Sequence, residues 1–164
     1  MQTAQDAIAR SLWISQTLMR RFVDDLTPAE YLHRAAPKAN CVAWLLGHLI
    51  LTERQALTAI GVAPAELPAL SDGFEKPFGR DEATAMAADF GDVSGLLALW
   101  EHHRQMLIDA VKRASPDLIS KPLEKPRPMF STVGEMANFM AQHATMHAGQ
   151  ITIIRRSLGK PPLI

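Results

Sequence analysis

The sequence predicts an all-α fold, a four-helix bundle with a long crossover between the second and third helices. Four segments repeat apolar residues at steps of three and four, which is the spacing of one face of a helix. Proline and glycine are concentrated between these segments, and the connection after the second helix is too long for an ordinary bundle turn. No segment shows a convincing period-two alternation, so no strand is expected. This inventory is typical of a helical bundle with a crossover.

The composition points to one soluble domain. The chain has 164 residues, 17 basic and 17 acidic side chains, and 48% apolar residues. This length suits a single domain over residues 1–164. A formal charge of zero argues against a nucleic-acid partner, which requires a basic excess to neutralise phosphates.

Membrane insertion and export are not expected either. The most apolar stretch, residues 43–51, is much shorter than a membrane-spanning helix, and the first residues lack the basic start of a signal peptide. The single cysteine, Cys41, has no internal partner for a disulfide, which favours a reducing compartment. We therefore expect a cytoplasmic protein.

Caps and breakers set the bounds of the first two helices. The first helix is expected over residues 3–23. Residues 27–30 have the sequence Thr-Pro-Ala-Glu. The threonine can cap a helix, proline suits its first position, and the glutamate can complete a capping box, so a short helical turn is predicted here. The second helix is expected from a cap at Asn40 to about Ile60, with Gly61 as its stop.

The second half of the chain is expected to hold the crossover and the last two helices. The crossover covers residues 61–80, with a short helix expected at 81–90. The third helix is expected to begin at about 92 or 94 and to end near 114. Four prolines then predict an extended or looped segment within 115–130, and a capping box opens the fourth helix over 132–159. Both long connections are expected to shape a pocket.

Three histidines occupy positions on the apolar faces of the predicted helices, where aliphatic side chains would be expected. His143 and His147 are four residues apart on the apolar seam of the fourth helix, and His48 lies on the seam of the second. Burying imidazoles is costly unless each finds a partner. Histidines at this spacing can bind one ion, so a shared divalent metal would satisfy all three. The alternative is that each is a core histidine bonded to a nearby carbonyl or side chain.

Three neutral imidazoles suit Zn²⁺, Ni²⁺, Fe²⁺ or Co²⁺ and leave a coordination position for water or substrate, as in catalytic sites. Such an ion acidifies bound water or holds a thiol as thiolate. A di-iron carboxylate site is not expected, because no glutamate lies at the required offset before either histidine of the fourth helix. The zincin motif is missing too, because Ala144 stands in place of its glutamate.

Two segments resemble the DinB-like family, also called the YfiT-like metal-dependent hydrolase group. They are Trp-Leu-Leu-Gly-His-Leu at 44–49 and His-Ala-Thr-Met-His-Ala-Gly-Gln at 143–150, the second followed by Ile-Arg-Arg-Ser-Leu-Gly. The resemblance implies an up-down-down-up bundle, frequent homodimers and a divalent metal on His48, His143 and His147. Relatives of known activity use bacillithiol, mycothiol or glutathione in transferase or isomerase reactions.

The resulting hypothesis is a metal-dependent enzyme that activates a thiol or water for attack on a small electrophile. Its cofactors would be one zinc, nickel or iron ion and, for a transferase, a low-molecular-weight thiol. The competing hypothesis is a non-enzymatic dimeric stress or regulatory module with a structural or sensory metal. A structural metal site needs a fourth ligand, and His103 is the candidate. The alternative for His103, and the commoner one, is a partly solvated side chain that binds no metal.

Other side chains have weaker claims. His33 could line the mouth of the pocket or pack on the end of the bundle, and Cys41 is expected to be a small buried apolar residue. Carboxylates often orient the histidine ligands of metals. Three glutamates are candidates for that role: Glu53, Glu101 and Glu135.

Overall fold

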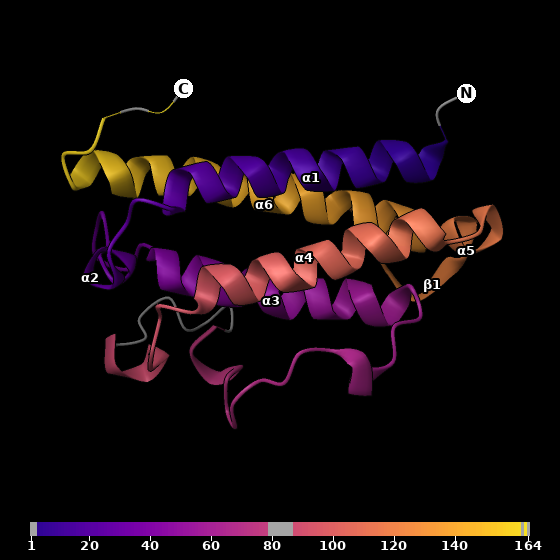
Figure 1. Cartoon of the computed structure of the whole chain (residues 1–164), viewed down its shortest axis with the longest axis horizontal. Helices are drawn as coiled ribbons and strands as arrows, with labels where there is room; N and C mark the ends of the chain where they lie inside the picture. The colour runs from indigo at the N-terminus through magenta and orange to yellow at the C-terminus, as the bar shows by residue number, and fades with distance from the viewer. Residues whose placement is uncertain (1–2, 79–86, 162, 164) are drawn as a thin grey trace.

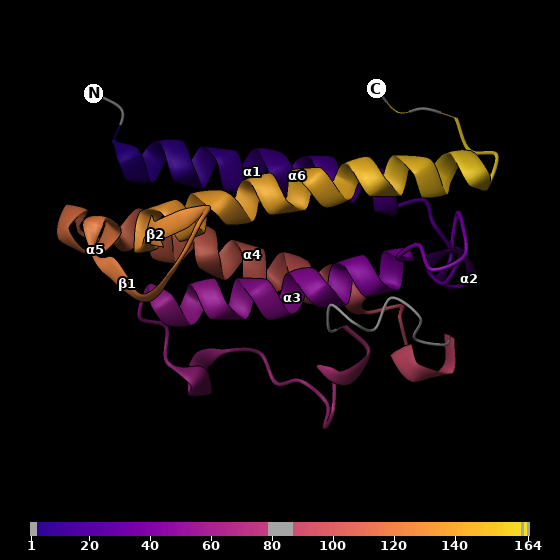
Figure 2. The same cartoon turned by 180° about the vertical axis from the view of Figure 1, so that it is seen from behind.

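The computed structural model describes residues 3–78, 87–161 and 163 of the chain, and it confirms the all-α class. Four long helices form the bundle: α1 (Ala4–Val23), α3 (Val42–Ala59), α4 (Leu96–Arg113) and α6 (Val133–Ser157). In both views α1 and α6 lie side by side and run in the same direction, while α3 and α4 run in the opposite one (Figure 1, Figure 2). This is the expected up-down-down-up arrangement.

Two predicted helix starts are confirmed and a third is wrong by one residue. Thr27 and Thr132 accept hydrogen bonds from the backbone of the third residue of α2 (Pro28–Tyr31) and α6, and each completes a capping box. Helix α3 instead begins after Cys41, whose extended backbone has φ −93° and ψ 168° and whose thiol caps nothing. Cys41, which is fully buried, therefore occupies the cap position that was expected for Asn40.

The segment after α4 is more regular than expected. Ser115 caps a helical turn, α5 (Pro116–Ser120), with proline in the first position. Strands β1 (Pro122–Arg127) and β2 (Phe130–Thr132) then pair antiparallel. The expectation of no strand is therefore wrong. A two-stranded hairpin tolerates the prolines of β1 because one edge of that strand has no ladder to complete.

The crossover packs along the outside of α3. It contains two single 3₁₀ turns, Pro64–Glu66 and Lys76–Phe78, and a third turn, Ala87–Phe90, precedes α4. The third turn falls at the end of the helix expected over 81–90, of which residues 81–86 lie outside the described residues. Among the helices that the structure describes, none has the length and apolarity needed to cross a bilayer.

A buried arginine joins the four long helices near the middle of the bundle. Arg104 on α4 donates to the carboxylate of Glu53 on α3, with 2.8 Å from Nε to Oε1. It also donates to the carbonyl oxygen of Leu12 and the hydroxyl of Ser15 on α1, and to the carbonyl oxygen of Met140 on α6, at 3.1, 2.5 and 3.0 Å. Arg104 and Glu53 are both inaccessible to solvent. Arg104 therefore links the two histidine-bearing helices, α3 through Glu53 and α6 through the carbonyl of Met140.

Candidate metal centre

The fold brings together the three histidines that the sequence singled out. Helix α3 presents His48, and α6 presents His143 and His147 from successive turns. One nitrogen from each ring lies within 4.8 Å of the other two. His143 and His147 are buried, and His48 is only partly covered because it faces a cleft.

The nitrogen spacing fits a single ion. The Nε2 atoms of His143 and His147 are 2.9 Å apart. Two nitrogens bound tetrahedrally at about 2.0–2.1 Å from zinc would lie about 3.3 Å apart, so small ring rotations reach that geometry. The ring of His48 stands nearly perpendicular to the other two, at 82° and 89°, with its centroid 5.1 and 5.5 Å from theirs. Three imidazoles therefore converge on one volume.

A side-chain amide orients one of the rings. Nδ1 of His147 donates to Oε1 of Gln150 at 3.0 Å. This bond keeps the proton on Nδ1 and leaves the Nε2 lone pair directed at the other histidines, as hydrogen bonds to metal-ligating histidines commonly do. Burial lowers the pKa of His147 to about 4, so the ring is neutral at physiological pH. A neutral imidazole is the form that binds metals.

Aromatic rings hold the other two histidines. Trp44 stacks on His48 from the preceding turn of α3, with centroids 4.8 Å apart and an interplanar angle of 9°. Phe139 stacks on His143 in the same way on α6, at 5.7 Å and 15°. These stacking contacts restrict the rotation of both imidazole rings and place apolar surface beside them.

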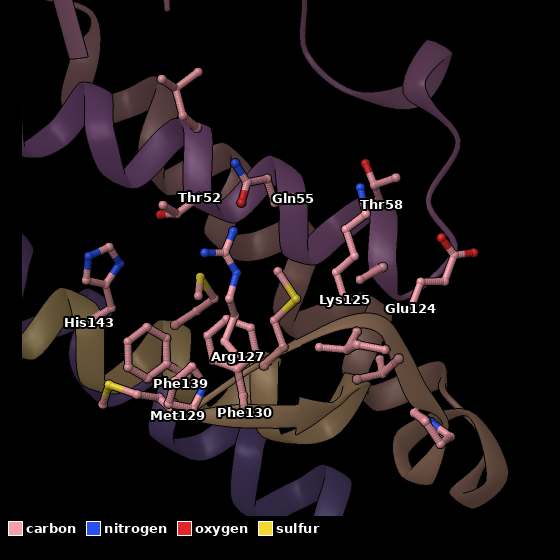
Figure 3. A pocket seen from close by; sticks show the side chains of 18 of the residues that line it. Thr52, Gln55, Thr58, Glu124, Lys125, Arg127, Met129, Phe130, Phe139 and His143 are labelled. Carbon is pink, nitrogen blue, oxygen red and sulfur yellow. The ribbon is translucent and has the colours of Figure 1, made fainter. Parts of the chain in front are cut away.

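A cleft of about 1200 Å³ opens beside the histidines. It lies between α3, α6 and the β1–β2 hairpin, and His48 and His143 form part of its wall. Figure 3 shows the imidazole of His143 at one end of this space. Within the described part of the chain, the cluster of potential ligands contains the three histidines alone. Both long connections contribute to the cleft, as predicted, through Phe78 and the hairpin.

Gly47 makes room for the wall of the cleft next to His48. A Cβ atom at this position would lie 2.3 Å from the buried ring of Phe78, which lines the cleft. We expect Gly47→Ala to lower the free energy of unfolding by about 1–3 kcal/mol, because overpacking forces the ring or the helix to move. Urea denaturation measures this change.

Gly149 on α6 gives a matched control. A Cβ atom there would meet nothing within 4 Å among the described residues. Gly149→Ala should therefore stabilise the protein by about 0.5–1 kcal/mol through helix propensity. Equal effects of the two substitutions would contradict the close contact between Gly47 and Phe78.

The structure corrects the expectation for His103 and agrees with those for two other residues. His103 is neither a fourth ligand nor partly solvated: it is fully buried, donates from Nδ1 to the carbonyl oxygen of Leu99 at 2.8 Å, and accepts from Arg54 at 3.1 Å. His33 bonds to Ser157 at 2.9 Å. Cys41 is buried, as expected.

The three glutamates have partners other than the histidines. Glu53 pairs with Arg104, Glu101 with Arg20, and Glu135 caps α6. The side chain that orients one of the three candidate ligands, His147, is Gln150, which the sequence analysis did not identify. Its signal is the i, i+3 spacing from His147, which places the two side chains on one face of a helix.

Sequence comparison identifies the family of the chain. A sequence model of the DinB superfamily matches residues 13–151, which include all four long helices except the ends of α1 and α6. No curated protein matches the chain in sequence. The match covers most of the chain, and His48, His143 and His147 lie within the matched residues. The chain belongs to the DinB superfamily.

Proposed function

We propose that this protein binds one divalent metal ion through His48, His143 and His147 and is an enzyme. In this proposal the ion activates a thiol or water for attack on a small electrophilic substrate. The observation that carries the proposal is the convergence of three imidazole nitrogens within 4.8 Å at the wall of a large cleft. An ion held there would act as a Lewis acid that lowers the pKa of bound water or thiol.

Other residues would position the three histidines and give reactants access to the ion. Gln150 keeps the Nε2 lone pair of His147 directed at the site. Trp44 and Phe139 stack on His48 and His143 and restrict the rotation of these two rings. The cleft admits reactants on the side of His48 and His143. Apolar side chains around the histidines, together with access from the cleft, suit a reactive site.

The competing function is a non-enzymatic dimeric stress or regulatory module with a structural or sensory metal. A structural site is closed by a fourth side chain. Among the described residues the cluster holds three potential ligands, and His103 is engaged elsewhere. This favours the enzyme. A homodimer is compatible with both functions, and exposed apolar side chains on α1 and α6 support it: Ile14, Met146 and Ile153.

Metal analysis tests the proposal directly. Untagged protein, purified without nickel resin, is expected to contain about one divalent ion per chain by plasma mass spectrometry, as three histidine ligands hold one ion. The loaded protein should then transfer bacillithiol, mycothiol or glutathione to an electrophile, or hydrolyse an activated ester, faster than the protein stripped with EDTA. A chain that takes up no zinc, nickel or iron would refute the metal site. A chain that binds metal tightly without any turnover would favour the non-enzymatic module.

A further inference from the structure

The cleft beside the histidines is cationic at the end formed by the hairpin. Three basic side chains line this end and only one acidic side chain accompanies them: Lys121, Lys125 and Arg127 against Glu124. The whole chain, in contrast, has equal numbers of basic and acidic residues. Positive charge is therefore concentrated where the cleft opens, which favours anionic ligands.

Arg127 is the cation best placed to bind such a ligand. It lies at the end of β1, and its side chain lines the cleft and points toward α3, which contributes Thr52 and Gln55 to the same cleft (Figure 3). Among the described residues no ion pair or hydrogen bond neutralises it, whereas Arg104 and Arg155 are both paired with carboxylates. A guanidinium presents a planar fork of donors that matches a carboxylate.

The space between Arg127 and the histidines is mostly apolar on one side. Met136, Met140, Phe130 and Phe139 line it from α6 and the hairpin. The facing side belongs to α3, which spans about 15 Å from His48 to Thr58 at 1.5 Å per residue. A ligand that fills this cleft therefore needs an apolar body.

We infer that the cleft binds an amphipathic carboxylate, with the acid group on Arg127 and the apolar body over Met136 and Phe139. The opposite end of the ligand then reaches His48 and His143, where the chemistry would occur. This inference deepens the proposed function by assigning the class of substrate or thiol that the site accepts, and it makes Arg127 a specificity-determining residue. The exposed guanidinium of Arg127 offers the carboxylate a charge-assisted bidentate contact at the edge of the apolar surface.

Binding of octanoate and its neutral analogue octanamide tests the inference. The experiment uses the full chain in EDTA, so that neither probe binds through a metal, and follows chemical shifts or heats at low salt. Octanoate is expected to bind about threefold to fivefold more tightly than octanamide, because the side chain of Arg127 is exposed and solvent weakens its ion pair. Arg127→Gln should remove this preference and leave octanamide binding unchanged.

Arg113→Gln is the matched control, because Arg113 is an exposed arginine at the end of α4, outside the cleft. This variant should keep the preference for octanoate. Equal affinities of the two probes for the wild-type protein, or a preference that survives Arg127→Gln, would overturn the inference. Because the test is run without metal, either result leaves the metal analysis unaffected, and a chain without metal affinity can still show the preference.

Discussion

Replacing His147 with alanine is expected to abolish tight binding of the divalent ion while the helical content stays largely intact. His147 contributes one of three converging nitrogens, and its Nε2 is the one oriented by Gln150. Loss of a partner that only orients a ligand typically weakens metal binding 10–100-fold, so loss of the ligand itself should cost at least about 100-fold. Competition with a chromophoric chelator measures the affinity, and far-UV circular dichroism measures the helix.

Replacing a histidine outside the cluster shows whether the loss of any imidazole, and not of this one, weakens metal binding. His33 bonds to Ser157 near the end of α6, and His33→Ala should bind metal like the wild type. Gln150→Ala should fall between the two variants, with a loss of about 10-fold, because the ring keeps its position but loses the bond that fixes its proton. An unchanged affinity in His147→Ala would refute the assignment of the ligands.

The spacing of apolar residues was enough to predict the four long helices of this protein. Helical steps and caps such as Thr132 depend on residues close together in sequence, and the structure confirms them. The hairpin escaped prediction because its strands are short and β1 contains prolines that normally argue against a strand. The start of α3 was displaced because the buried Cys41, whose thiol caps nothing, occupies the cap position in place of the polar Asn40.

Some residues of the candidate site could also be predicted from the sequence, and others could not. His48, His143 and His147 stand out because polar residues occupy seam positions, which is a local signal. Arg127 gives no such signal, since its place in the cleft depends on how the hairpin folds over α3 and α6. Glu53 and Arg104 also lie at helical positions that face the core, but only the tertiary structure shows that each is the other's partner.

The pairing of Glu53 with Arg104 leads to the largest expected effect on stability. Burial raises the pKa of Glu53, and the Arg104 guanidinium opposes that rise. Arg104→Met removes the cation and leaves a fully buried carboxylate without its partner. Breaking a buried pair in this way costs about 3–5 kcal/mol, a large share of the roughly 5–15 kcal/mol that stabilises a domain. The melting temperature should fall by about 6–20 °C, as calorimetry would show.

The double variant Glu53→Leu, Arg104→Met tests whether the unpaired charge causes this loss. Because neither charge remains, the double variant should recover much of the stability lost in Arg104→Met, as buried pairs often exchange for apolar residues at little cost. A double variant no more stable than Arg104→Met would show that the arginine acts mainly through its bonds to Leu12, Ser15 and Met140.

The same variants separate stability from assembly of the metal centre. Glu53 lies five residues after His48 on α3, and the carbonyl of Met140 lies one turn before His143 on α6, so Arg104 holds both ligand-bearing helices beside the cluster. If this bond network fixes their relative height, the double variant should remain folded yet bind metal several-fold more weakly, since misplaced ligands coordinate poorly. Full affinity in the folded double variant would show that apolar packing alone aligns the three histidines. The metal titration of this variant therefore decides whether the buried arginine belongs to the construction of the site or only to the stability of the bundle.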